Sequence, residues 1–227
     1  MTEADATAEL PLIEFDRVRK AFGVGPAVLE QASFTVGRGQ LVVLSGANGA
    51  GKSTVLKLIT GDLAPDRGRV AVAGEQPARL RGAPLRTLRQ AIGIVPPDPH
   101  LLADRSVLEN VMLPALVGGL SRRAAAERAR TALLRLGVSD HARMPAQLSA
   151  AAQLRAALAR AVVNRPAILL LDEPTAFLDT EGAAGLLRLL DEFAQAGMAV
   201  LLASHGEPAP LPPTARRLRL VEGRVCA

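Results

Sequence analysis

Residues 46–54 read G-A-N-G-A-G-K-S-T and complete the pattern G-x-x-x-x-G-K-S. A largely apolar run at 40–45 precedes them and predicts a buried strand, whereas residues 52–59 predict the start of a helix. A strand, a glycine-rich loop and a helix N-terminus, in that order, are the setting of a phosphate-binding loop. The glycines let backbone N–H groups approach phosphate oxygens, and the helix dipole adds positive potential at the same place.

The polar residues of this loop have chemistry suited to a bound nucleotide. Lys52 offers a positive charge to the β- and γ-phosphates, and the Ser53 hydroxyl is a ligand for Mg²⁺. A chance glycine-rich turn before a helix is the alternative, which the complete pattern in the right context disfavours. We therefore expect a nucleotide to bind along the whole loop, which consists of Gly46, Ala47, Asn48, Gly49, Ala50, Gly51, Lys52, Ser53 and Thr54.

Composition indicates one globular domain in a reducing compartment. The chain has 227 residues, of which 49% are hydrophobic and 22% charged, and its one cysteine, Cys226, excludes an internal disulfide. Residues 1–11 form a polar tail without the features of a secretory signal, and residues 12–227 form the domain. No apolar stretch is long enough to span a bilayer, so we expect a cytoplasmic protein that reaches a membrane only through a partner.

Charge and aromatic content disfavour a nucleic-acid partner. The net charge of +5 comes from 27 basic and 22 acidic residues, and the basic residues are spread along the chain. Aromatic residues make up only 2% of the sequence, which leaves no stacking platform for single strands. We expect no nucleic acid to bind.

Hydrophobic patterning predicts an α/β fold. Residues 12–18 suggest an edge strand, and further strands are predicted at 32–36, 69–73, 92–95, 167–171 and 198–203, with a hairpin at 217–225. Helices are predicted at 121–136, with Ser121 as the cap, at 150–163 and at 182–196. This order indicates a mostly parallel sheet, a small antiparallel layer and an inserted helical subdomain at about 98–163.

Two acidic residues and a histidine follow predicted core strands. Asp172 ends a continuous apolar strand, where it is placed to hold Mg²⁺, and Glu173 is placed to orient or deprotonate a water. Solvated turn residues are the alternative, which the five apolar residues before them disfavour. His205 follows the next core strand and is a second catalytic candidate at the same edge of the sheet, although a lone histidine is often structural.

These segments together resemble the nucleotide-binding domain of the ABC ATPases. The resemblance extends from about residue 12 to 225 and rests on the phosphate loop followed by L-S-A-A-A-Q-L-R (148–155), L-L-L-D-E-P-T (169–175), F-L-D (177–179) and S-H (204–205). It implies a P-loop NTPase core of ABC type, with ATP and Mg²⁺ as cofactors. It also implies that Phe22 stacks on adenine, with Val28 among the nucleotide-binding residues.

The same resemblance implies a site shared by two chains. ATP would hold two copies head-to-tail, so that the signature residues Ser149, Ala150 and Ala151 of one chain face the nucleotide of the other. Asp179 would belong to the D-loop at that interface.

Within the family the chain is similar to the cell-division ATPase FtsE. The likeness rests on L-R-x-x-I-G-I-V (88–95), H-L-L (100–102), D-R-S-V (104–107) and A-R-A-V-V-N (159–164). It implies an integral membrane partner like FtsX. The alternatives are the ATPase of an exporter or lipoprotein-release system, and a nucleotide-binding scaffold with little or no turnover.

Two departures from the family pattern predict slow hydrolysis. Ala150 and Ala151 replace the two signature glycines, and their methyl groups hinder a close approach of backbone to phosphate. Pro97 stands in the segment where the family has a glutamine and offers no polar side-chain atom. Since loss of one positioned polar contact costs about 10²-fold in turnover, we expect Mg-ATP binding with reduced hydrolysis.

Overall fold

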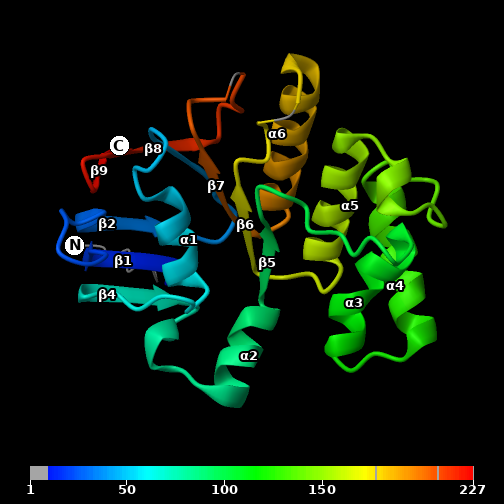
Figure 1. The fold of residues 1–227 in the computed structure, drawn as a ribbon, viewed down its shortest axis with the longest axis horizontal. Coiled ribbons are helices and arrows are strands. Elements are labelled where there is room, and N and C mark those ends of the chain that lie inside the picture. Colours follow the sequence, from blue (N-terminus) through cyan, green and yellow to red (C-terminus); the bar gives the residue numbers. More distant parts are fainter. Residues whose placement is uncertain (1–9, 177, 209, 227) are drawn as a thin grey trace, which may run out of the picture.

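A computed structural model of the chain describes residues 10–176, 178–208 and 210–226. Residues 1–9 of the predicted polar tail and Phe177 of the F-L-D motif lie outside the described residues. The described chain forms two β-sheets, with helices between them and on one side (Figure 1).

The smaller sheet is antiparallel, with the strand order β2-β1-β4. Its strands are β1 (Ile13–Lys20), β2 (Leu29–Val36) and β4 (Arg67–Val72). Because β1 pairs with both neighbours, the prediction of an edge strand at 12–18 is wrong. Its loose alternation has another cause: the register shifts after Phe15, and Arg17 adopts a left-handed φ of 47°.

The larger sheet carries the order β5-β6-β7-β3-β8-β9. These strands are β5 (Ile92–Val95), β6 (Ile168–Asp172), β7 (Ala199–Ser204), β3 (Leu41–Ser45), β8 (Arg216–Val221) and β9 (Arg224–Cys226). The pairs from β5 to β8 are parallel, and β9 returns antiparallel to β8, which confirms the predicted hairpin. The parallel strands therefore place their carboxyl ends at one common edge.

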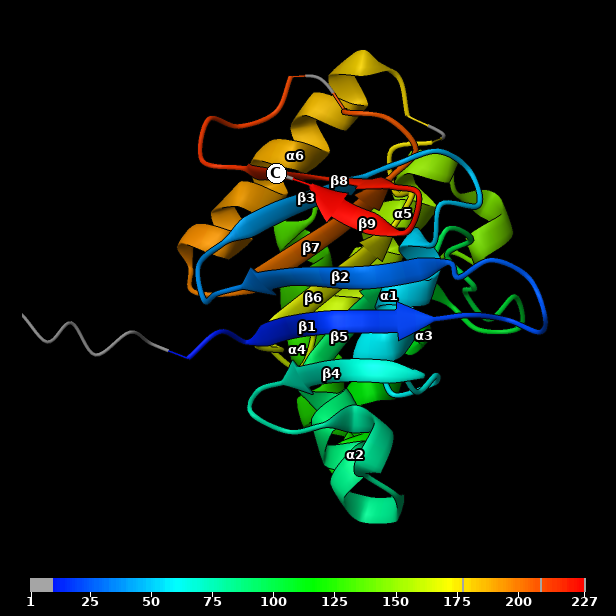
Figure 2. The same cartoon turned by 90° about the vertical axis from the view of Figure 1, so that its left-hand side faces the viewer.

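Alternate residues of the parallel strands belong to two separate cores. In β6, Ile168 and Leu170 pack into the core that contains the antiparallel sheet, whereas Leu169 and Leu171 pack into the helical core. Helix α1 (Lys52–Ile59) lies in the first core, between the two sheets, and α6 (Thr180–Gln195) covers the opposite face (Figures 1 and 2). A strand buried on both faces explains the unbroken apolar run of β6.

The segment between β5 and β6 contains three helices that pack on one another (Figure 1): α3 (Val107–Val117), α4 (Arg122–Arg135) and α5 (Ala150–Val162). Ser121 caps α4, as predicted, by accepting a hydrogen bond from Ala124 N–H at 3.3 Å. Helices α2 (Gly82–Gln90) and α3 are additions to the predicted set, as are the short turns Pro77–Arg79 and Pro145–Gln147. Within the described ranges no helix is long and apolar enough to cross a bilayer.

Candidate functional site

The glycine-rich loop connects β3 to α1, and two of its glycines sit where a side chain would collide. A Cβ built at Gly51 would lie 2.7 Å from Val28 Cγ1, and Gly51 adopts a φ of +109°. A Cβ at Gly46 would lie 2.8 Å from the carbonyl oxygen of Leu220 in β8. The loop therefore packs closely between the sheets and leads directly into the first turn of α1, whose N–H groups have no helical partners.

Lys52, the first residue of α1, reaches back across the loop. Its ammonium donates to the carbonyl oxygens of Gly46 at 2.8 Å and Ala47 at 3.1 Å. It also forms an ion pair with Glu173, with 3.2 Å between Nζ and Oε1. Only 6% of the lysine side chain is exposed, so this charge is buried between the loop carbonyls and Glu173.

Ser53 and Asp172 form a pair of oxygen donors suited to a divalent cation. The Ser53 hydroxyl donates to Asp172 Oδ2 at 2.7 Å, which joins the start of α1 to the end of β6. Asp172 is buried, and in the part of the chain that the structure describes its Oδ1 has no hydrogen-bond partner. Mg²⁺ at nucleotide sites usually binds phosphate oxygens and only one or two protein groups, a role that Ser53 and Asp172 fit by their chemistry.

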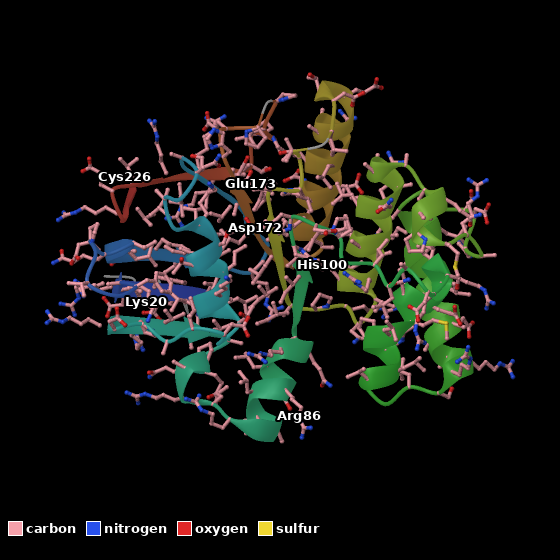
Figure 3. All side chains as sticks on the ribbon, in the orientation of Figure 1. Lys20, Arg86, His100, Asp172, Glu173 and Cys226 are labelled. Atoms are coloured by element: carbon pink, nitrogen blue, oxygen red, sulfur yellow. The ribbon has the colours of Figure 1, made fainter. Side chains whose placement is uncertain are left out.

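Glu173 and His205 meet at the carboxyl ends of β6 and β7. Glu173 Oε2 accepts a hydrogen bond from the backbone N–H of His205 at 2.8 Å, while Oε1 faces Lys52. Glu173 adopts a left-handed φ of 51°, an uncommon conformation that turns the chain just after the strand. Figure 3 shows Asp172 and Glu173 together at this end of β6, beside α1. The His205 side chain is exposed and lines a cavity of about 930 Å³ together with loop residues 46–50.

Phe22 and Val28 flank the loop from the antiparallel sheet. Phe22 lies two residues after the end of β1 and is 52% exposed, and the ammonium of Lys20 lies 5.6 Å from its ring centroid. Val28 touches the Gly51 position and donates its N–H to the carbonyl of Lys20 at 2.8 Å. The two residues therefore belong to one segment that passes beside the start of α1.

The predicted trans residues lie at helix starts. Ser149 caps α5 by accepting from Ala152 N–H at 3.3 Å, and Asp179 caps α6 by accepting from Gly182 N–H at 2.8 Å. Ser149 and Ala150 are exposed, and Ala151 is half-buried. Among the described residues, none of the signature three lines the cavity at the phosphate loop.

A second, smaller cavity is lined both by residues that depart from the family pattern and by Glu173. It measures about 100 Å³, and its lining includes Pro97, Ala150 and Glu173. Arg160 of α5 anchors the adjoining proline-rich turn by donating to the carbonyls of Pro99 at 2.5 Å and His100 at 2.8 Å. Sequence reasoning missed this role of Arg160, because the contact spans 60 residues and has no local pattern.

Comparison with known proteins places this architecture in a family. A model described as ABC transporter matches residues 29–176. The cell division ATP-binding protein FtsE of Escherichia coli (strain K12) is 42% identical over 195 residues, which is 86% of this chain and 88% of that protein. The lipoprotein-releasing system ATP-binding protein LolD 2 of Rhodospirillum rubrum is 39% identical over 223 residues, 95% of this chain and 96% of its own length.

Solved structures agree in fold. The bacterial ABC transporter cassette MJ0796, seen as a dimer and in a post-hydrolysis state with ADP and Pi, superposes with a TM-score of 0.82 at 28% identity. That match covers 95% of this chain and 97% of the solved chain. The predicted fold, a P-loop NTPase core of ABC type with an antiparallel layer and inserted helices, is confirmed. With a family model that spans more than half of its residues, the chain belongs to the ABC transporter family as an ATP-binding, ATP-hydrolysing cassette.

Proposed function

We propose that this chain is the ATPase subunit of an FtsE-like complex, peripheral on the cytoplasmic face of a membrane and bound to an FtsX-like integral partner. Two copies close around two molecules of Mg-ATP, and hydrolysis releases them. The observation that carries the proposal is the convergence of Lys52, Ser53, Asp172 and Glu173 at the loop before α1.

Each residue in that group has a defined task. The loop amides and Lys52 bind the phosphates, Ser53 and Asp172 hold Mg²⁺, and the cation neutralises charge that develops on the γ-phosphate. Glu173 orients the attacking water or accepts a proton from it. His205 lies beside it, at the end of the neighbouring strand β7. Phe22 stacks on the base, which sets the nucleotide's orientation.

A groove between the sheet core and the inserted helices supports docking of a membrane partner. It has a volume of about 340 Å³ and runs between α2, β5, α3 and α5. Ile94 and Val117 line it with side chains that are 41% and 78% exposed, beside Arg86 and Arg89 of α2. Figure 3 labels Arg86 on α2. Exposed apolar side chains beside arginines suit a short amphipathic segment of the partner.

Two other functions each have an observation in their favour. The LolD 2 match covers nearly all of both chains, which keeps a lipoprotein-release or export complex open. The loss of both signature glycines and the presence of Pro97 favour a nucleotide-binding scaffold with little turnover. Co-purification with a tagged FtsX-like protein, compared with a tagged LolD-type membrane partner, separates the first two.

The first experiment measures phosphate release from Mg-ATP by the purified chain, with Lys52→Ala as the blank. Lys57→Ala is the matched control, because Lys57 is an exposed lysine of the same helix. We expect slow turnover in the wild type and in Lys57→Ala, and none in Lys52→Ala. Tight ATP binding without turnover, alone or with the membrane partner, would overturn the ATPase proposal in favour of the scaffold.

A further inference from the structure

Asp66 joins β4 to the end of β1, just before Phe22. Its carboxylate accepts two hydrogen bonds, from Lys20 Nζ at 2.9 Å and from the backbone N–H of Ala21 at 2.7 Å. Its own N–H donates to the carbonyl of Arg19 at 2.9 Å. Asp66 therefore holds consecutive residues, 19 to 21, immediately before the aromatic ring.

The same ion pair also fixes a charge against the ring. Lys20 Nζ lies over Phe22, 5.6 Å from the ring centroid, and the lysine side chain is only 15% exposed. The hydrogen bond from Lys20 lowers the pKa of Asp66, and the N–H of Ala21 adds to this, because both contacts favour the ionised carboxylate. One face of Phe22 is thus taken by an ammonium, in a ring that remains half exposed.

We propose that Asp66, through Lys20 and Ala21, is a positioning residue that holds Phe22 as a preformed platform for the base of the nucleotide. This inference rests on the proposed function, because it requires that Phe22 stacks on the base. It means that the affinity for the nucleotide base depends on a residue outside the phosphate loop. Asp66 lies 45 residues along the chain from Ala21, whose N–H it binds.

Local backbone freedom explains why such a clamp is needed. Residues 22–26 read F-G-V-G-P, and Gly23 adopts a φ of +67° with nothing near its Cβ position. All five of these residues are exposed. A flexible, glycine-containing loop loses conformational entropy when its aromatic ring stacks on a ligand. The loss is smaller when the residues just before the ring are already fixed, as they are here by Asp66.

A surface ion pair that only joins β1 to β4 is the competing interpretation, since exposed pairs contribute little to stability. The two interpretations differ in what they predict for ligands with and without a base. A structural role would affect all ligands of the site alike, or none. A platform role affects only ligands that carry a base.

The test compares the affinities of Mg-ATP and Mg-tripolyphosphate for the full chain and for Asp66→Ala. Loss of base stacking costs about fivefold or more in affinity, so we expect Asp66→Ala to weaken ATP by roughly three- to tenfold. Tripolyphosphate affinity should not change, which also reports that the phosphate loop is folded. Glu14→Ala is the matched control, because it breaks the Glu14–Arg69 ion pair of 2.6 Å between the same two strands.

Phe22→Ala completes the experiment as a double-mutant cycle. If Asp66 acts through the ring, adding Asp66→Ala to Phe22→Ala should cost no further ATP affinity. Equal losses for ATP and tripolyphosphate, or full additivity of the two changes, would overturn the inference while leaving the ATPase proposal intact. A wild-type chain that binds neither ligand would instead contradict the proposed function.

Discussion

At the scale of single residues, the ion pair between Lys52 and Glu173 occupies the two groups that the proposed function assigns to phosphate binding and to activation of water. The ammonium that is needed for phosphate is satisfied by two loop carbonyls and by Glu173 Oε1 at 3.2 Å. In the proposed function, the γ-phosphate replaces that carboxylate contact when ATP binds. In the proposed mechanism, the same exchange frees Glu173 to face the attacking water, so that nucleotide binding and the activation of Glu173 as general base are coupled.

Glu173→Gln tests this coupling. The neutral amide holds Lys52 more weakly, so ATP affinity should rise by about three- to tenfold, as expected if the weakening is about the size of one ordinary hydrogen bond. Turnover should fall by about 10²-fold or more, because the amide cannot accept the proton of the water. Equilibrium nucleotide binding and phosphate release measure the two effects. Asp140→Asn, which removes an exposed pair with Arg143, should change neither; a weaker affinity in Glu173→Gln would contradict the exchange.

Residue chemistry made the phosphate side of the site predictable from sequence, because each group follows a strand or begins a helix in a recognisable order. Lys52, Ser53, Asp172 and Glu173 were all singled out in this way, and the structure brings them together. The pairing of Asp66 with Lys20 was not predictable, since a hydrogen bond across 46 residues leaves no local pattern.

At the scale of elements, the predicted set lacked two helices for different reasons. Helix α2 begins at Gly82 with no side-chain cap, and Pro84 follows in its first turn, so its sequence reads as a loop. Helix α3 is apolar nearly throughout and contains Pro114, so it shows no helical period. Its start did carry a signal, because Ser106 and Glu109 have the spacing of a capping box.

Ser106→Ala measures what that capping box contributes. Ser106 Oγ accepts from Glu109 N–H at 3.2 Å, and Glu109 Oε2 accepts from Ser106 N–H at 3.0 Å. Loss of the cap should lower the free energy of unfolding by about 1 kcal/mol and the melting temperature by about 2–4 °C. Thermal unfolding checks this, with Thr131→Ala, an exposed hydroxyl within α4, as a control expected to have little effect.

The pH dependence of this effect has a definite sign. The backbone N–H of Ser106 lowers the pKa of Glu109 below its ordinary value of 4.5, and the Ser106 hydroxyl adds to the shift. A carboxylate with a lowered folded-state pKa stabilises the fold above its unfolded pKa, and this contribution is lost as pH falls through the folded pKa. Ser106→Ala keeps this backbone N–H and removes only the hydroxyl, so the hydroxyl's share of the difference between wild type and variant should be full at neutral pH and shrink in acid below 4.5.

At the scale of the whole molecule, cassettes of this family work as dimers with membrane partners, and the proposed function places the start of α5 against a second copy. The start of α5 carries Ser149 as a cap, followed by alanines where the family pattern has glycines. Alanine is the better helix former by about 1 kcal/mol, so these replacements stabilise the start of α5 within one chain. In the proposed dimer, the same methyl groups would keep its backbone away from the phosphate of the facing chain.

The combined variant Pro97→Gln, Ala150→Gly and Ala151→Gly tests whether these positions limit turnover. Pro97 and Ala150 line one cavity with Glu173, so changes at both reach the same carboxylate. Turnover should rise by about tenfold or more, since each restored polar contact to the transition state acts on hydrolysis. Phosphate release at saturating ATP measures this effect. Repeating it over a range of protein concentrations shows whether the site needs two chains, because turnover per chain would then rise with concentration.

Stability supplies the internal control for that experiment. Two glycines at the start of α5 should lower the melting temperature, so a faster variant would be less stable than the wild type. A larger folded fraction then cannot explain the higher turnover of the variant, so the increase must come from the nucleotide-binding site. Lys52→Ala in the same background gives the blank. A restored variant that binds ATP as tightly as the wild type and hydrolyses it no faster would show that slow turnover has another origin.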